Sequence, residues 1–528
     1  MALDLKSYTL NKMLAQCVVP RLEGDRLGDK DYLKEILSLV DAGVGGFILF
    51  GGDYWEVRQA LSRLQSKAKQ PLLIVSDMER GVGQQLKGAT VFPCQMAVAA
   101  ATDLVSGEGL GQVSDMLQAV AEEARGAGVH AVLAPVLDVN SNPDNPIICT
   151  RAFSDEPKSV SGLGELYTKG LQGAPHPVMA CAKHYPGHGD TTLDSHDKLP
   201  VIEKDRDSLE EEDMLPFRKS VMAGVEMVMT GHLMVPAIDP LLPASLSSKV
   251  TRGYLRNRAN FGGLVLTDAL NMGALTKHYS QREAARLAIK AGADILLHPA
   301  DPAAFMADVD AMAKDKDVTK EDVSYPMGRL LKAKAKYCVN AKLTESQIRE
   351  RFERNRELAD AIALRALTLV KAGGAFPSIK DIKGQVAHIV LEDDGDRKAG
   401  RVIRSVMAAR HKKLSNLFVT TSDVKKLGKE AMKRAKGAEL VIVSLFSKVK
   451  AGKGRSGISP ELLELARAIV SRSKKTVVVS FGSPYILRTF MDADYVVAAY
   501  DPTEAMQEAA CKAFMGEVVF RGELPVRI

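Results

Sequence analysis

The sequence predicts an α/β protein of two domains, a (β/α)8 TIM barrel followed by a smaller α/β sandwich domain with a mostly parallel sheet. Short apolar runs rich in β-branched residues alternate with segments of helical periodicity over about the first 300 residues. The same alternation resumes beyond the Gly- and Pro-containing stretch KAGGAFPSIKDIKG. A chain of 528 residues is long enough to bury two separate cores.

Eight apolar runs in the first region define the expected barrel strands. Continuous apolar runs separated by helical segments are typical of parallel strands that helices cover on both faces. Eight of them favour a closed barrel. A doubly wound sheet is the alternative, but no GxGxxG or GxxxxGK[ST] follows a run. The runs are Ala15–Pro20, Gly45–Phe50, Pro71–Asp77, Ala131–Val139, Val178–His184, Glu226–Leu233, Gly263–Leu270 and Asp294–Pro299.

Seven polar residues lie at the C-terminal ends of these runs. One such residue is usually only an N-cap for the next helix. Seven of them at the end of a barrel where active sites form indicate a shared pocket instead. They are Asp77, Asp138, Lys183, His184, His232, Asp268 and His298.

The rest of the chain predicts a connecting helix and a second domain. The segment Thr344–Val370 has the pattern of one long amphipathic helix. We therefore expect a barrel domain at 1–343, a helix and linker at 344–378, and an α/β sandwich at 379–528. The expected strands of the sandwich are Val386–Asp393, Leu417–Thr421, Leu440–Phe446, Thr476–Phe481 and Tyr495–Tyr500.

Composition excludes several classes of function. The net charge of +6 is small, and no basic stripe interleaved with aromatic residues indicates nucleic-acid binding. The basic stretch Lys448–Gly457 is better interpreted as a solvated loop than as an anion site. Six scattered cysteines indicate free thiols in a reducing compartment. With neither a signal-peptide pattern nor a long apolar run, we expect a cytoplasmic protein without membrane partners.

The stretch KHYPGHGDTTLDSH, Lys183–His196, concentrates titratable residues and allows three interpretations. His184 and His188 have the i, i+4 spacing of zinc ligands on a helix, but Pro186 and the glycines disfavour a helix. A purely structural polar turn is the second interpretation. The third is proton transfer, because the carboxylate of Asp194 can orient His196 two residues later.

Asp268, in GGLVLTDALNMGAL, is the expected chemical partner of this histidine. A carboxylate held at the end of a rigid strand suits nucleophilic attack on a sugar anomeric carbon. Retaining glycosidases usually pair such a nucleophile with a carboxylic acid roughly 5–5.5 Å away. Here the acid would be His196, oriented by Asp194. The residues alone therefore indicate a hydrolase or transferase with an Asp–His constellation.

Long ordered motifs resemble glycoside hydrolase family 3, and within it the bacterial β-N-acetylhexosaminidases. They are APVLDVN, NPIICTRAFS, GLQG, KHYPGHGDTTLDSH followed by LP, MVMTGHLMVPAID, PASLS and FGGLVLTDALNMGAL. The resemblance covers about residues 10–340. The second domain, with its closing GELPV, resembles the α/β sandwich of longer family members.

The resemblance implies retaining hydrolysis through a covalent glycosyl-aspartate. By motif position Asp268 is the nucleophile, and His196 is the acid/base with Asp194 as its partner. The residues implied to contact the terminal sugar are Asp77, Arg151, Lys183 and His184. Asp138 is interpreted as a residue that orients its neighbours or is structural, and His188, Asp190 and His232 as supporting residues.

The sequence departs from the family pattern after the third strand. Where relatives read D-x-E-G-G-R-V-x-R, this chain reads DMERGVGQQ, with Gln85 in place of the last arginine. A glutamine can still bond a sugar hydroxyl, although without the charge of arginine. We therefore include Gln85 among the expected substrate contacts and expect altered affinity or acceptor preference.

The predicted function is a retaining exo-β-N-acetylglucosaminidase acting on peptidoglycan fragments, as in peptidoglycan recycling, or on short chitooligosaccharides. A phosphorylase of the same fold is the first alternative, because a neutral histidine does not repel phosphate as a glutamate would. A β-glucosidase is the second, and a non-catalytic glycan-binding protein comes from another class. We expect a small carbohydrate substrate, no cofactor, no metal, and a monomer or weak homo-oligomer.

Overall fold

The computed structural model describes residues 8–339, 341, 343–450 and 452–528. Their contacts divide the chain into two compact units. The first comprises Met1–Phe92, Ser114–Val139 and Pro157–Asn355, and the second Pro93–Val113, Asn140–Glu156 and Arg356–Ile528. Two segments from within the barrel sequence therefore cluster with the C-terminal residues. The predicted domain boundaries at 343 and 378 stay predictions.

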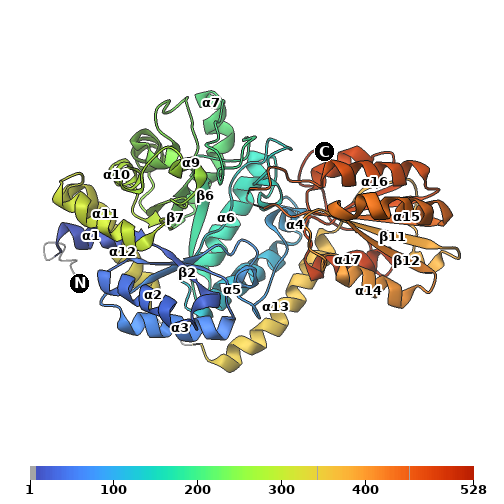
Figure 1. The fold of residues 1–528 in the computed structure, drawn as a ribbon, viewed down its shortest axis with the longest axis horizontal. Coiled ribbons are helices and arrows are strands. Elements are labelled where there is room, and N and C mark those ends of the chain that lie inside the picture. Colours follow the sequence, from blue (N-terminus) through green and yellow to red (C-terminus); the bar gives the residue numbers. More distant parts are fainter. Residues whose placement is uncertain (1–7, 340, 342, 451) are drawn as a thin grey trace. The chain divides into compact units, whose positions relative to one another are not determined.

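The first unit is a closed barrel of parallel strands, of which β2, β6 and β7 are labelled in Figure 1. Strands β2 to β8 pair in sequence order, and β1 pairs with β9. Pro20 separates β1 from β2, which together form one barrel strand because both pair with the chain around β3. Hydrogen bonds from β9 to both β8 and β1 close the ring, so the predicted barrel is confirmed. The strands are β1 (Val18–Val19), β2 (Arg21–Glu23), β3 (Gly46–Phe50), β4 (Leu73–Ser76), β5 (Ala131–Val132), β6 (Met179–Tyr185), β7 (Met227–Thr230), β8 (Leu264–Thr267) and β9 (Leu296–Leu297).

Alternate residues of these strands fill the barrel interior. Leu73 and Val75, Met179 and Cys181, and Leu264 and Leu266 belong to one buried cluster. The residues between them face the surrounding helices, which is why the strands are apolar on both faces and could be recognised as continuous runs.

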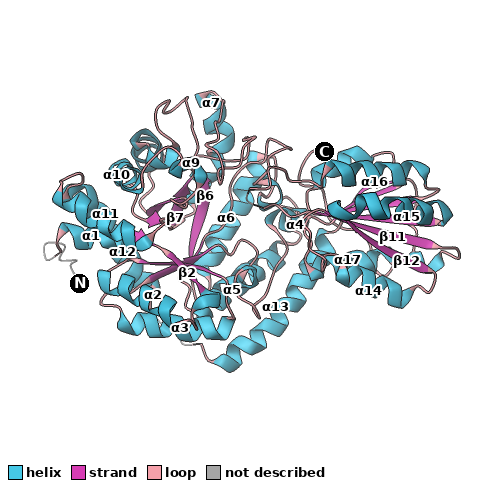
Figure 2. Cartoon of the chain, viewed as in Figure 1, coloured by secondary structure: helices cyan, strands magenta, loops and turns pink. Residues whose placement is uncertain are grey.

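The helices of the first unit surround the barrel (Figure 2). Several begin and end with ordinary caps: Asp29 and Asp53 each accept hydrogen bonds from two N–H groups of the following turn, and Gly43 closes a helix with a positive φ of 88°. The helices are α1 (Leu10–Gln16), α2 (Lys30–Ala42), α3 (Tyr54–Lys67), α5 (Leu110–Ala127), α6 (Pro157–Gly173), α7 (Arg206–Ser208), α8 (Leu215–Met222), α9 (Gly273–Thr276), α10 (Gln281–Ala291), α11 (Pro302–Lys314), α12 (Lys320–Tyr337) and α13 (Glu345–Ala366). Of these, α5 and α13 extend into the second unit.

The second unit is an α/β sandwich with a six-stranded sheet in the order β10-β15-β14-β13-β11-β12. All neighbouring strands are parallel except β10 and β15, so the predicted mostly parallel sheet is confirmed. Helices α15 and α16 pack together on one face, and α14 and α17 on the other (Figure 1). The elements are α4 (Gln95–Ala100), β10 (Thr368–Ala372), β11 (Val386–Glu392), α14 (Arg401–Arg410), β12 (Leu414–Thr420), α15 (Val424–Gly437), β13 (Leu440–Phe446), α16 (Pro460–Arg472), β14 (Thr476–Phe481), β15 (Tyr495–Ala498) and α17 (Glu504–Phe514).

One predicted helix is too long. The expected helix Thr344–Val370 ends at Ala366, and its last residues form the edge strand β10. Thr368, Leu369 and Val370 suit a strand, and pairing with β15 outweighs the helical pattern that precedes them.

Two further observations concern the whole described chain. All six cysteines are free thiols, as predicted, and five of them are buried. Among the described residues, no helix combines the length and apolar character needed to cross a bilayer.

Candidate active site

Two carboxylates among the polar strand-end residues continue the interior rows of the barrel. Asp77 follows Leu73 and Val75 at a spacing of two, and Asp268 follows Leu264 and Leu266 in the same way. Because side chains alternate along a strand, these carboxylates extend the inward-facing rows. They therefore belong to the C-terminal end of the barrel, where (β/α)8 enzymes have their active sites.

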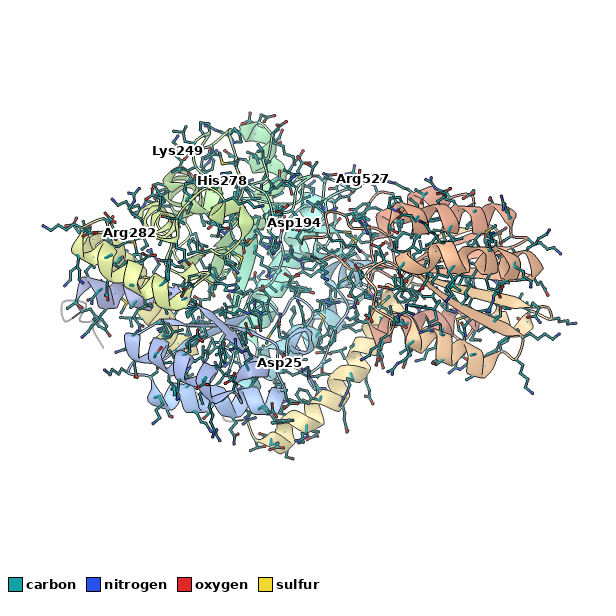
Figure 3. All side chains as sticks on the ribbon, in the orientation of Figure 1. Asp25, Asp194, Lys249, His278, Arg282 and Arg527 are labelled. Carbon is teal, nitrogen blue, oxygen red and sulfur yellow. The ribbon has the colours of Figure 1, made fainter. Side chains whose placement is uncertain are left out.

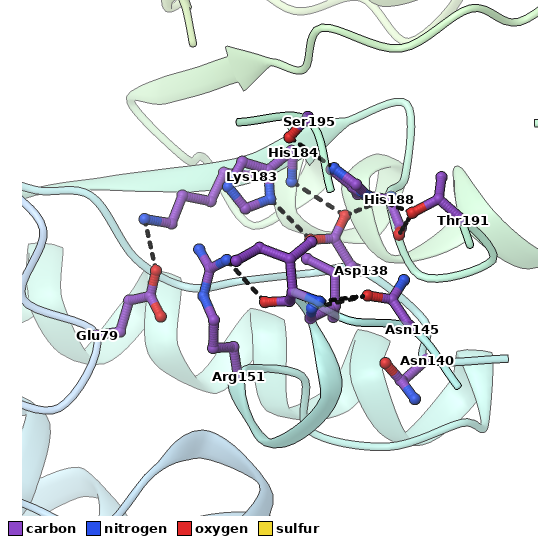
Figure 4. A network of polar contacts seen from close by, with 12 residues as sticks. Glu79, Asp138, Asn140, Asn145, Arg151, Lys183, His184, His188, Thr191 and Ser195 are labelled. Carbon is purple, nitrogen blue, oxygen red and sulfur yellow. Dashed lines mark hydrogen bonds and ion pairs between the residues drawn. The ribbon is translucent and has the colours of Figure 1, made fainter. Parts of the chain in front are cut away.

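Lys183 lies between two carboxylates. Its Nζ is 2.7 Å from Asp77 Oδ1. It is also 2.7 Å from Glu79 Oε1, a contact that Figure 4 shows. The lysine side chain is only 2% exposed and that of Glu79 8%, whereas Asp77 is 28% exposed. The buried cation is thus paired, and Asp77 retains an accessible edge. Glu79 was not among the predicted site residues. Its position two residues after Asp77, in the same loop, could have indicated that it belongs to the site.

Asp138 is a fully buried acceptor that organises the end of β6. Its Oδ2 accepts from His184 Nδ1 at 2.8 Å, and its Oδ1 accepts from the N–H groups of His184 and His188 at 3.1 and 2.7 Å (Figure 4). Burial works to raise the pKa of Asp138, but His184 and the N–H donors outweigh it and lower the pKa. Through these contacts Asp138 holds the backbone of both histidines, and it fixes the tautomer of His184 with its proton on Nδ1.

The loop 186–200 after β6 contains Asp194, which is labelled in Figure 3, and His196. Asp194 Oδ1 accepts from His196 Nδ1 at 2.8 Å and from the His196 N–H at 2.9 Å. The carboxylate is 5% exposed, but the imidazole is 42% exposed. The pair therefore combines a buried, fixed acceptor with an imidazole that is open to a substrate.

The same loop is bound to the chain that follows Asp268. The N–H of Gly273, at the start of α9, donates to His196 O at 3.0 Å, and Ala274 N–H donates to Ser195 O at 3.3 Å. Lys277 Nζ donates to Asp197 O and Oδ1, both at 2.6 Å. The backbone of the histidine loop thus contacts the segment that continues from β8, only a few residues beyond Asp268.

The surroundings of Asp268 favour the ionised form of its carboxylate. Burial works to raise its pKa. Opposing effects outweigh burial and lower the pKa to about 2: they come from the imidazoles of His184, His232 and His196 and from the Ala269 N–H, which donates to Oδ1 at 2.7 Å. His232 Nε2 also donates to Ala269 O at 3.0 Å, and its Nδ1 accepts from Ser245 Oγ at 2.7 Å. His232 therefore fixes the backbone beside the carboxylate.

Comparison with known proteins decides the family. Residues 9–333 match the family described as glycosyl hydrolase family 3 N terminal domain. The chain belongs to glycosyl hydrolase family 3. The predicted family is confirmed, and with it the enzyme class at the level of glycoside hydrolase.

Individual family members agree with this placement. A protein of Pseudoalteromonas piscicida named beta-hexosaminidase A is 32% identical over 393 residues, which are 68% of this chain but 64% of the length of that relative. A Cellulomonas fimi protein named beta-N-acetylglucosaminidase/beta-glucosidase is 26% identical over 92% of this chain and 88% of its own. The solved structure of a family 3 beta-N-acetylglucosaminidase from Paenibacillus sp. str. FPU-7 superposes with a TM-score of 0.84, at 28% identity and 99% coverage of both chains.

Two predicted sugar contacts of this family 3 chain have local partners. Gln85 Nε2 donates to Asp77 O at 3.0 Å, and its Oε1 accepts from Gly51 N–H at 3.3 Å, so its amide links the loops after β3 and β4. Arg151 lies in the short helix Cys149–Arg151 of the second unit, where its Nη1 donates to Ile147 O at 3.0 Å. Their roles as sugar contacts stay predictions.

Proposed function

We propose that the chain is a retaining exo-β-N-acetylglucosaminidase that releases terminal β-linked GlcNAc. The observation that carries the proposal is the position of the Asp194–His196 pair, on a loop whose backbone is bound to the segment immediately after Asp268. An ionised carboxylate and an oriented imidazole are the two groups that double displacement at an anomeric carbon needs.

In the first step Asp268 attacks the anomeric carbon while the glycosidic C–O bond breaks. The imidazolium of His196 donates its Nε2 proton to the leaving oxygen, because Nδ1–H remains bonded to Asp194. In the second step the neutral imidazole removes a proton from water, whose oxygen displaces Asp268 and restores the carboxylate. Asp194 stabilises the charged imidazolium in the first step and holds the tautomer in the second.

The residues at the strand ends bind the terminal sugar in this proposal. Asp77, with its exposed edge, accepts hydrogen bonds from sugar hydroxyls, while Lys183 and His184 are held by Glu79 and Asp138 in fixed positions. Arg151 and Gln85 complete the set of contacts, with the glutamine replacing the arginine of the family pattern.

The Paenibacillus structure is named a beta-N-acetylglucosaminidase and the Cellulomonas fimi relative a beta-N-acetylglucosaminidase/beta-glucosidase, which supports GlcNAc as the sugar. We propose peptidoglycan fragments or short chitooligosaccharides as its sources. Six free thiols support a location in the reducing cytoplasm, where peptidoglycan fragments are recycled. We propose a monomer or weak homo-oligomer.

Parallel assays of aryl β-GlcNAc and aryl β-glucoside, with and without phosphate, test the proposal. The wild type should release GlcNAc, Asp268→Ala should be nearly inactive, and His196→Ala should lose less activity as the leaving group becomes more acidic. Asp25→Ala, an exposed carboxylate variant, is the control and should match the wild type. Activity that survives Asp268→Ala would contradict the proposal.

Phosphorolysis is the second candidate, because the acid/base is a histidine, which in its neutral form does not repel a phosphate anion as a carboxylate would. The phosphate arm separates the two reactions. GlcNAc-1-phosphate as the main product would establish the phosphorylase, whereas free GlcNAc in the presence of phosphate would establish the hydrolase.

A further inference from the structure

The imidazole of His188 bonds to two other residues of the loop 186–200, which also contains the Asp194–His196 pair. Its Nδ1 lies 2.7 Å from Thr191 Oγ1, and its Nε2 lies 3.0 Å from Ser195 Oγ (Figure 4). Ser195 is located between the two members of the pair in sequence. The imidazole therefore holds the loop shortly after it leaves β6 and again at the pair itself.

The hydrogen bonds around His188 are satisfied together by one arrangement of protons. The Thr191 hydroxyl donates to His188 O at 3.1 Å, so it accepts from Nδ1–H, and Nε2 then accepts from the Ser195 hydroxyl. Burial lowers the pKa of His188 to about 4, which keeps the ring neutral near pH 7. A neutral imidazole whose ring nitrogens both bond to loop hydroxyls suits a link within the loop better than a role in proton transfer.

Asp138 connects this link to the sugar-binding end of the site. Its Oδ1 accepts from the N–H groups of both His184 and His188. The carboxylate that orients His184 thus also fixes the backbone from which the His188 ring extends to the loop.

We propose that His188 is a positioning residue that holds the 186–200 loop in the conformation that places His196 for proton transfer. The inference rests on the proposed function, and it assigns to His188 an effect that acts through His196. A purely structural histidine would affect folding or all substrates alike. A positioning residue should affect most those substrates that need protonation of the leaving group.

The experiment uses the full chain with His188→Asn, which removes the acceptor for Ser195, and Ser195→Ala, which removes the same bond from the loop side. His188→Gln is the conservative variant, because its side-chain oxygen can accept from Ser195 at the position of Nε2. His176→Asn is the control, since His176 lies just before β6, at the opposite end of the barrel from the loop. The value of kcat/KM is measured for each variant with β-GlcNAc glycosides whose leaving groups range from dinitrophenol to a simple alcohol.

We expect His188→Asn and Ser195→Ala to lower kcat/KM roughly 10- to 100-fold for the alkyl glycoside and less than about 3-fold for the dinitrophenyl glycoside, as part of the 10²–10⁴ that a general acid contributes. His188→Gln should recover part of the loss. In the His196→Ala background, adding His188→Asn should change the alkyl rate by less than about 2-fold, because coupled residues are not additive. Hydrogen exchange in the loop should rise in His188→Asn and Ser195→Ala but not in His176→Asn.

Equal losses for both leaving groups, or full additivity with His196→Ala, would overturn the positioning role. Unchanged rates and unchanged loop exchange in both His188→Asn and Ser195→Ala would overturn it as well. A wild type that releases no GlcNAc, or an unaffected His196→Ala, would instead overturn the proposed function and the inference that rests on it, so the two failures are distinguishable.

Discussion

One carboxylate oxygen of Asp194 accepts hydrogen bonds from both the backbone N–H and the imidazole Nδ1 of His196. The first bond fixes the turn and the second fixes the ring, so two torsions of the histidine are restrained by one buried group. Because a carboxylate can only accept, Nδ1 keeps its proton and Nε2 is the atom that exchanges one with a substrate. The geometry therefore selects the reactive nitrogen.

Asp194→Asn keeps the shape of this pair but removes the charge that stabilises the imidazolium. We expect kcat/KM for an alkyl β-GlcNAc glycoside to fall by about 10²–10⁴, as in other carboxylate–histidine pairs. Asp197→Asn, on the same loop but in an exposed ion pair with Lys277, is the control and should lose little activity. Asp194→Asn with more than half of the wild-type activity would contradict the role of the pair.

The spacing of Asp194 and His196 made this pair predictable, because a carboxylate two residues before an imidazole can reach its Nδ1 within one turn. The positions of Asp77 and Asp268 were predictable for a different reason. Apolar strands of a barrel are continuous in sequence, and the polar residue that ends each one must lie at the common rim. Both arguments are local and need no knowledge of the packing between distant segments.

Contacts between distant segments were not predictable in this way. The pairing of Glu79 with Lys183 joins residues from two strand ends, and the amide of Gln85 bonds to the chain after β3, far from it in sequence. β10 was assigned to the preceding helix because only β15 supplies the hydrogen bonds that make it a strand. In each case the partner that determines the structure lies far along the chain.

Gly273 allows the histidine loop to lie against the segment after Asp268. A Cβ added there would lie 2.8 Å from His196 O and 3.0 Å from Asp197 O, closer than backbone atoms tolerate. Gly273→Ala should therefore displace the loop and lower kcat/KM for an alkyl glycoside about 10-fold or more, with a smaller effect on a dinitrophenyl glycoside. The measurement is the ratio of the two rates.

Gly262→Ala is the matched control for this substitution. It lies shortly before β8, and nothing is within 4 Å of an added Cβ. We expect wild-type rates for Gly262→Ala with both substrates. If Gly273→Ala behaved like Gly262→Ala, the loop would not depend on this close approach.

The low pKa of Asp268 predicts how the nucleophile responds to pH. A carboxyl with a pKa of about 2 is ionised throughout the range above it, so acidification from neutral pH does not remove the nucleophile until pH approaches 2. The measurement uses His196→Ala with a β-GlcNAc fluoride, whose leaving group needs no protonation. In this variant His184, His232 and the Ala269 N–H still lower the pKa of Asp268, although His196 no longer does. The rate of this variant should be flat between about pH 4 and pH 7. A fall with an apparent pKa inside that range would show that Asp268 takes up a proton earlier.

Two ion pairs of the same length differ in burial, so comparing them isolates the effect of burial on stability. Lys183–Asp77 and Lys87–Asp25 are both 2.7 Å long, but the lysine side chains are 2% and 73% exposed. Lys183→Met leaves the carboxylates of Asp77 and Glu79 without their cation and should lower the free energy of unfolding by about 3–5 kcal/mol. Lys87→Met, the exposed control, should leave denaturant unfolding unchanged, because water solvates the remaining carboxylate. Adding Glu79→Gln to Lys183→Met removes the more buried of the two negative charges and should restore part of the loss. If Lys183→Met unfolded at the same denaturant concentration as Lys87→Met, the lysine between the two carboxylates would not stabilise the barrel end.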